Sequence, residues 1–108
     1  MIGKVVTVTV DRPIGSRHLK YPDMIYPINY GYVKEIMAPD GEEQDAYILG
    51  VDVPLAEFSG RVLAIIRRLD DVEDKLVVAP EGVSFTENQI IEMTEFQERY
   101  FNSTVETL

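Results

Sequence analysis

The sequence lacks cysteine and is short of basic side chains. Among its 108 residues, 19 are Asp or Glu and only 10 are Lys or Arg, which gives a net charge of −9. Without cysteine the chain has no disulfide framework, no thiolate metal ligand and no cysteine nucleophile. The deficit of Lys and Arg disfavours a nucleic-acid partner, because neutralising a phosphate backbone needs a surplus of cationic side chains. A phosphate substrate is compatible with this acidic chain only if metal ions lie between the two.

Long apolar runs are also absent. No stretch reaches the roughly 20 residues that a membrane-spanning helix needs. Residues 1–10 alternate valine with threonine in part and do not resemble a signal peptide. We therefore expect no membrane association and a cytoplasmic location. A chain of 108 residues can bury one modest core, so we expect a single domain over residues 1–108.

Several short segments have the patterns of β-strands separated by turns. Residues 4–10 alternate, with Val6 and Val8 on one face and Thr7 and Thr9 on the other, as in a half-buried strand. By similar patterns we expect strands at residues 4–10, 33–37, 46–53, 61–69 and 76–79. Gly31, between two tyrosines, indicates a bulge or a close approach of two backbone segments. Short strands at this spacing favour a mainly β fold and a small barrel.

One helix is expected near the C-terminus. Thr86 and Gln89 have the spacing of a capping box, which marks the beginning of a helix. We expect its apolar face to comprise Ile90, Met93, Phe96 and Tyr100. The remaining segment, residues 102–108, is polar, and we expect it to fray.

Acidic side chains are concentrated in two turns. Asp40, Glu42 and Asp45 lie close together between two apolar segments. Like charges held close repel, so that one carboxylate would tend to take up a proton. A divalent cation removes this conflict, and oxygen ligands suit Mg²⁺. The trio therefore indicates a metal site, although Pro-Asp-Gly before a strand is also ordinary turn chemistry. A second acidic turn, residues 70–75, could meet the first in a barrel.

Four motifs in the same order resemble the soluble (family I) inorganic pyrophosphatases. Residues 26–32 match the family's Tyr-Pro-x-Asn-Tyr-Gly segment, and residues 40–45 correspond to its Asp-x-Asp-x-x-Asp signature. Residues 11–21 are similar to its Glu-x-Pro-x-Gly-Ser-Arg segment with the following Lys-Tyr, and residues 75–80 follow an acidic turn as in the family. The resemblance extends from residue 6 to about residue 100.

This resemblance implies a five-stranded OB-type barrel with one C-terminal helix. It also implies that the chain hydrolyses pyrophosphate to two phosphates with several Mg²⁺ ions, with Mn²⁺ as a possible replacement, and that it forms a homo-oligomer. Metal ions would neutralise the substrate, lower the pKa of a bound water and bracket the attacking and leaving oxygens.

The resemblance further implies roles for individual residues. Asp45 would bridge two metal ions, and Glu42 would take the place of the base that activates a water. The metal ligands would be Asp11, Asp40, Asp45, Glu73 and either Asp70 or Asp71. The contacts to phosphate oxygens would come from Lys20, Tyr30, Lys75 and Tyr100.

The chain also departs from the family pattern. Glu42 and Glu73 stand where the family has Asp, and Phe101 stands where it has Lys. The segment after Tyr21 is short, so that a hairpin carrying a phosphate-binding Arg is missing, and Arg12 and Arg17 are the alternatives for its role. A shift of about 1 Å in a catalytic group can lower a rate on the order of a hundredfold. Metal binding is thus a firmer expectation than fast turnover. Two alternatives remain: a relative that acts on another phosphoanhydride, and a non-enzymatic module.

Overall fold

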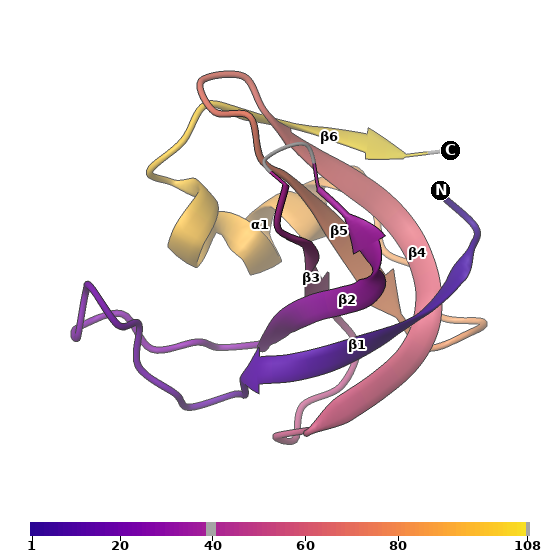
Figure 1. The fold of residues 1–108 in the computed structure, drawn as a ribbon, viewed down its shortest axis with the longest axis horizontal. Helices are drawn as coiled ribbons and strands as arrows, with labels where there is room; N and C mark the ends of the chain where they lie inside the picture. Colours follow the sequence, from indigo (N-terminus) through magenta and orange to yellow (C-terminus); the bar gives the residue numbers. More distant parts are fainter. Residues whose placement is uncertain (39–40, 108) are drawn as a thin grey trace.

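The fold is built around one long, curved strand. The computed structural model describes residues 1–38 and 41–107. Its elements are β1 (Val5–Arg12), β2 (Asn29–Met37), β3 (Glu43–Ile48), β4 (Glu57–Arg68), β5 (Asp74–Ala79), α1 (Glu87–Glu98) and β6 (Ser103–Thr107). Figure 1 shows β4 curving around the molecule, with β1 crossing its first part and β6 lying along its later part.

Five of the strands close into a barrel. The order is β1-β2-β3-β5-β4, and β1 also pairs with β4, which completes the ring. Neighbouring strands are antiparallel except β3 and β5, which are parallel. The expected mainly β fold, a five-stranded OB-type barrel with a single helix, is confirmed. Four strands begin earlier than the sequence patterns indicated: β2 at Asn29, β3 at Glu43, β4 at Glu57 and β5 at Asp74. The strand expected over residues 46–53 ends at Ile48.

The expectation of a frayed C-terminal tail is wrong. Ser103–Thr107 forms β6, which pairs with the second half of β4 in a register running from Ala64 opposite Thr107 to Arg68 opposite Ser103. Val105 packs against the core on this strand. The tail is polar because its other side chains lie at the surface of an edge strand. Its partner strand is distant in the sequence, so the pairing leaves no local pattern.

Apolar side chains form two clusters, one on each side of the sheet. The cluster inside the barrel comprises Val6, Val8, Val33, Ala46, Ile48, Val62, Leu76 and Val78. The cluster between the barrel and α1 comprises Tyr26, Tyr30, Tyr47, Leu49, Ala64, Ile66, Val77 and Ile90. Alternate residues of β3 and β5 enter alternate clusters, as expected for strands buried on both faces.

A bulge in β4 changes which cluster its side chains enter. Val62 pairs with Val78, but Ala64 pairs with Val77, so the register shifts between them. Val62 accordingly lies in the barrel interior, whereas Ala64 lies in the cluster beneath α1. A bulge inserts one extra residue, so the side chains that follow it lie on the opposite face of the sheet from the one that simple alternation would give. Because Arg68 continues the alternation that begins at Ala64, the bulge directs it to the α1 side.

The helix begins as the sequence indicated. The Gln89 amide N–H donates to Thr86 Oγ1 at 3.2 Å, and the Thr86 amide N–H donates to Gln89 Oε1 at 2.8 Å, which forms the expected capping box. Ile90 is fully buried, while Tyr100 lies beyond the end of α1 and is 60% exposed. The assignment of Tyr100 to the apolar face was therefore wrong. The buried positions of α1 include three polar residues, Thr94, Gln97 and Glu98.

The expected close approach at Gly31 is confirmed. A Cβ atom built on Gly31 would lie 1.9 Å from the carbonyl oxygen of Thr9 on the neighbouring strand β1. Glycine is therefore required where β2 crosses β1.

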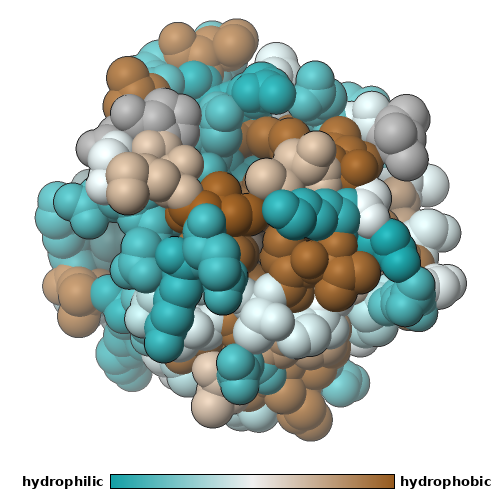
Figure 2. Space-filling view, turned by 45° about the vertical axis from the view of Figure 1, so that its right-hand side comes forward, coloured by the Kyte–Doolittle hydropathy of each residue, from teal (hydrophilic) through white to brown (hydrophobic). Residues whose placement is uncertain are grey.

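The molecular surface mixes apolar and charged groups. Figure 2 shows apolar residues gathered near the centre of one face, crossed and bordered by hydrophilic ones. In the described part of the chain, no helix is both long and apolar enough to cross a membrane.

Candidate functional site

Three strands carry charged side chains at the same end of the apolar cluster beneath α1. Asp45 lies two residues before Tyr47 in β3, and Lys75 lies two residues before Val77 in β5, while Arg68 ends β4. Side chains two residues apart in a strand share a face. Because Tyr47 is opposite Val77 in the parallel pair, Asp45 and Lys75 lie side by side. Strand alternation and register thus bring three charged groups together on the side of the sheet that faces α1.

A cleft of about 480 Å³ opens over this end of the sheet. Its cationic lining residues are Arg12, Lys20, Arg68 and Lys75. Its carboxylates are Asp11, Asp45 and Glu73. Cationic groups therefore outnumber carboxylates along the cleft, although the chain as a whole carries a net charge of −9. Positive groups gathered in a concave site attract anions, and two of these cations, Arg68 and Lys75, are held by neighbouring carboxylates.

Lys75 joins the two acidic segments. Its Nζ donates to Asp45 Oδ2 at 2.6 Å and to Glu73 Oε2 at 3.2 Å, and its side chain is only 4% exposed. The Tyr30 hydroxyl donates to the same Asp45 oxygen at 2.8 Å. Burial and the neighbouring Asp45 carboxylate raise the pKa of Tyr30 well above its ordinary value, so the hydroxyl stays protonated and remains a donor. Asp45 and Glu73, from different turns of the sequence, therefore meet at one cation.

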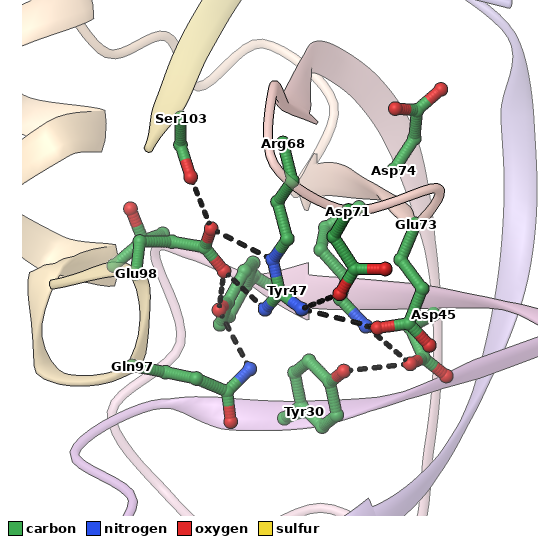
Figure 3. Close-up of polar contacts among 12 residues, drawn as sticks. Tyr30, Asp45, Tyr47, Arg68, Asp71, Glu73, Asp74, Gln97, Glu98 and Ser103 are labelled. Atoms are coloured by element: carbon green, nitrogen blue, oxygen red, sulfur yellow. Dashed lines mark hydrogen bonds and ion pairs between the residues drawn. The ribbon is translucent and has the colours of Figure 1, made fainter. Parts of the chain in front are cut away.

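Arg68 is the second fixed cation of the cleft. Its side chain is 3% exposed, and its guanidinium donates to Glu98 through Nε at 3.1 Å and Nη2 at 2.8 Å. Nη1 donates to Glu73 Oε2 at 3.1 Å, and the guanidinium stacks over the Phe101 ring at 3.6 Å. Figure 3 shows Arg68 between Glu98 on one side and Glu73 on the other. Arg68 thereby ties the end of α1 to the turn before β5.

The Glu98 carboxylate is the centre of a buried polar network. Besides Arg68, it accepts hydrogen bonds from the Tyr47 hydroxyl at 2.6 Å and from Ser103 Oγ at 2.7 Å. Burial alone would raise the pKa of Glu98, but the hydrogen bonds from Arg68, Tyr47 and Ser103 outweigh it and lower this pKa. Gln97 Nε2 donates to the Tyr47 hydroxyl at 2.8 Å. The network holds the helix against the sheet beside the cleft.

Seven of the residues expected in the site line the cleft. They are Asp11, Lys20, Tyr30, Asp45, Glu73, Lys75 and Tyr100. Burial raises the pKa of the Asp11 carboxyl, an effect that Arg12 opposes and Asp45 reinforces. Of the two arginines considered as replacements, Arg12 lines the cleft, whereas Arg17 donates to the carbonyl oxygen of Pro22.

Other expected site residues lie elsewhere. Asp40 falls outside the described residues. Glu42 is exposed in the turn before β3, where its carbonyl oxygen accepts from the amide of Ala38, and it does not line the cleft. Both carboxylate oxygens of Asp70 accept from the amide of Asn102 at 3.1 Å. Asp71 lies nearer to the site, since its Oδ2 is 3.8 Å from Arg68 Nη1.

The carboxylates of the cleft are the type of ligand that suits a divalent metal, because Mg²⁺ prefers oxygen ligands. Within residues 1–38 and 41–107, however, no three acidic or histidine side chains are grouped so that they could enclose an ion. The space between Asp45 and Glu73 is bridged by the Lys75 ammonium group. Glu73 is thus engaged by two cations, Arg68 and Lys75, and Asp45 by Lys75 and the Tyr30 hydroxyl.

The sequence interpretation missed Arg68 and His18. The signal for Arg68 was present in β4, because its buried positions alternate through Ala64 and Ile66 and continue to Arg68. His18 lines the cleft, and its Nδ1 accepts from the amides of Lys20 and Tyr21. Burial, Arg12 and Lys20 lower the pKa of His18, which favours the neutral ring. No local sequence pattern distinguished this histidine from a surface residue.

The fold and cleft together define an OB-type barrel with a cleft lined by cationic and acidic side chains. The chain matches the family model described as inorganic pyrophosphatase over residues 4–106. It is 29% identical over 115 residues to soluble inorganic pyrophosphatase 2 of Chlamydomonas reinhardtii, covering 91% of this chain and 60% of that protein. The chain therefore belongs to the inorganic pyrophosphatase family.

Solved structures support the same fold. An inorganic pyrophosphatase from Ehrlichia chaffeensis superposes with a TM-score of 0.73 at 17% identity, covering 99% of this chain and 88% of that one. The inorganic pyrophosphatase from Coxiella burnetii gives a TM-score of 0.70 at 19% identity, covering 99% and 86%. These similarities concern the barrel, and the chain spans only 60% of the length of the Chlamydomonas relative.

Proposed function

We propose that this chain hydrolyses inorganic pyrophosphate to two phosphates with the help of Mg²⁺, for which Mn²⁺ can substitute. The observation that carries the proposal is the arrangement of Lys75 and Arg68, two almost fully buried cations fixed by carboxylates in the cleft of a pyrophosphatase-family barrel. A polyanion entering this cleft meets four cationic side chains, Arg12, Lys20, Arg68 and Lys75.

In this proposal Asp45 and Asp11 hold the metal, together with Glu73 and with Asp40, which lies outside the described residues. Bound Mg²⁺ would supply charge neutralisation and a water of lowered pKa. Two further roles rest on the resemblance alone, namely Glu42 as the base and Asp70 or Asp71 as an additional ligand. Glu42 and Asp70 do not line the cleft in this structure.

The contacts to phosphate oxygens are assigned to residues of the cleft. Lys20 and Lys75 supply ammonium groups, and Tyr30 and Tyr100 supply hydroxyls. Cations and donors positioned around a transferring phosphoryl group stabilise the charge that develops on its oxygens. Lys75 is already oriented by Asp45 and Glu73, so little ordering is needed when substrate binds.

The test is phosphate release from pyrophosphate with and without Mg²⁺, in wild type and in Asp45→Asn. We expect release that depends on the ion and is abolished by the substitution. Asp52→Asn, at an exposed position after β3, is the matched control and should retain the wild-type rate. An Asp45→Asn protein with the wild-type rate would contradict the assignment.

A second readout does not depend on turnover. An ion that binds only the folded protein raises its melting temperature, so millimolar Mg²⁺ should stabilise the wild type and stabilise Asp45→Asn less. Equal shifts in the two proteins would place the ion away from Asp45.

We also propose that the chain self-associates in the cytoplasm. Several large apolar side chains are exposed, among them Met37 at 73%, Val72 at 66% and Leu69 at 65%. Self-association would remove such side chains from water, which is favourable. Sedimentation velocity would show a single monomeric species if self-association is wrong, and cell fractionation tests the location.

A further inference from the structure

A second hollow adjoins the cleft. Its volume is also about 480 Å³, and it shares Lys20, Tyr21, Met24 and Tyr100 with the cleft. The two spaces therefore adjoin at these side chains. Sites for drug-sized ligands have volumes of roughly 300–1,000 Å³, so the cleft alone already exceeds what a diphosphate requires. The combined space is suited to a ligand that extends beyond two phosphate groups.

Two stacked tyrosines stand at the junction. The rings of Tyr21 and Tyr100 lie 5.8 Å apart with an angle of 16° between their planes, and they are 54% and 60% exposed. Both rings come from well-anchored backbone, since the amide of Tyr21 donates to His18 Nδ1 and the amide of Tyr100 donates to the carbonyl oxygen of Gln97. An anchored, exposed aromatic pair of this kind is a platform on which a flat aromatic group can stack.

Cationic side chains lie on both sides of this platform. Lys20 lines both spaces, and Arg99 lines only the second hollow, where its side chain is 52% exposed. Deeper in the cleft, Lys75 and Arg68 supply the fixed positive charge described above. The cleft is thus lined by cations and its junction with the second hollow by aromatic rings, while the second hollow has Arg99 and Asp23 among its lining residues. A ligand matching this arrangement carries phosphates at one end and an aromatic ring at the other.

We propose that the cleft and the second hollow together bind a nucleoside triphosphate, with its phosphates in the cleft and its base stacked on an outer face of the Tyr21–Tyr100 pair. This inference rests on the proposed function, because both ligands use the same phosphate-binding cleft. Every base presents a flat π-face, so the stacking contact selects for a base without selecting which one. Lys20 lies where the phosphate chain passes the platform.

The test is equilibrium binding by calorimetry in Mg²⁺, with two ligands that resist hydrolysis. One is the β,γ-imido analogue of ATP, and the other is imidodiphosphate, which has the same P–N–P unit without a nucleoside. We expect Tyr21→Leu to weaken binding of the ATP analogue at least about fivefold, the lower limit for loss of one base–aromatic stack. Its affinity for imidodiphosphate should stay as in wild type. Tyr21→Phe keeps the ring and should bind both ligands as wild type does.

Arg99→Glu gives an independent measurement, because Arg99 lines only the second hollow. Charge reversal there should weaken the ATP analogue and spare imidodiphosphate. The inference is overturned if wild type binds the ATP analogue no more tightly than imidodiphosphate, or if Tyr21→Leu and Arg99→Glu bind both ligands as wild type does. If wild type binds neither ligand, the proposed function fails together with this inference. Binding of imidodiphosphate without any effect of the two substitutions on the ATP analogue contradicts this inference alone.

Discussion

Replacing Glu98 by Gln should destabilise the protein far more than the similar size of the two side chains suggests. The Glu98 carboxylate accepts four hydrogen bonds, two of them from the Arg68 guanidinium. The side chains of Arg68 and Glu98 are 3% and 8% exposed, so water cannot solvate the Arg68 guanidinium in place of the lost carboxylate charge. Breaking a buried ion pair by removing one partner typically costs about 3–5 kcal/mol. That is a large part of the roughly 5–15 kcal/mol by which a domain is stable.

The assay is urea unfolding followed by circular dichroism, with thermal melting as a second measure. We expect a lower midpoint with an unchanged slope, since the surface exposed on unfolding is the same. For a chain of this length, each kcal/mol lost at the transition lowers the melting temperature by roughly 4–8 °C. The matched control is Arg67→Gln, at the neighbouring position, where the ion pairs with Asp74 and Glu106 are exposed. Exposed pairs contribute about 0–1 kcal/mol, so this variant should unfold close to wild type.

A double substitution tests the reasoning further. Arg68→Met with Glu98→Leu removes both charges and leaves apolar groups beside the Phe101 ring. Removing both members of a buried pair is often neutral, whereas removing one strands a charge. The double variant should therefore be less destabilised than the sum of the two single ones. Strict additivity, or a Glu98→Gln protein within about 1 kcal/mol of wild type, would refute the account of a dry, charge-paired network.

Three other predictions concern stability. Hydrogen bonds from Arg68, Tyr47 and Ser103 outweigh burial and lower the pKa of Glu98. The charged carboxylate therefore stabilises the fold at pH values above its ordinary pKa of 4.5, and this stabilisation is lost as the pH falls below 4.5. Glu98→Gln should accordingly flatten the acid side of a plot of melting temperature against pH. Gly31→Ala should lower stability by 1–3 kcal/mol or more in urea unfolding, roughly the range for overpacking, because the added Cβ would meet backbone at 1.9 Å. Thr86→Ala should cost about 1 kcal/mol in the same assay by removing the helix cap.

Features encoded within a few neighbouring residues could be predicted from the sequence. The alternation of β1 placed Val6 and Val8 in the core, and the Thr86–Gln89 spacing marked the beginning of α1. Gly31 indicated a bulge or a close backbone approach, because glycine is the amino acid without a Cβ atom. In each case the physical cause, whether a period of two or a local hydrogen bond, lies within the segment itself.

Features that depend on distant partners could not be predicted in this way. The tail forms β6 because the second half of β4 offers it a free edge, and nothing within residues 102–107 reveals that edge. Arg68 is buried because Glu98 and Phe101 complete its surroundings, and both follow it by some thirty residues. The bulge at Val62 and Ala64 decides which way Arg68 points, and the sequence there is uniformly apolar. The site could therefore be outlined from motifs, Lys75 included, but the second fixed cation, Arg68, could not.

In the proposed function, the position of these cations reconciles an acidic protein with an anionic substrate. Surface charges act on an approaching anion only within about 8–10 Å at physiological ionic strength, because salt screens them. Inside the cleft, Lys75 and Arg68 are shielded from salt by their burial. Carboxylates from β3, from the turn before β5 and from α1 hold both cations in place before any ligand arrives. Net charge therefore governs how often a polyanion reaches the molecule, whereas the local arrangement of a few buried groups governs whether it stays.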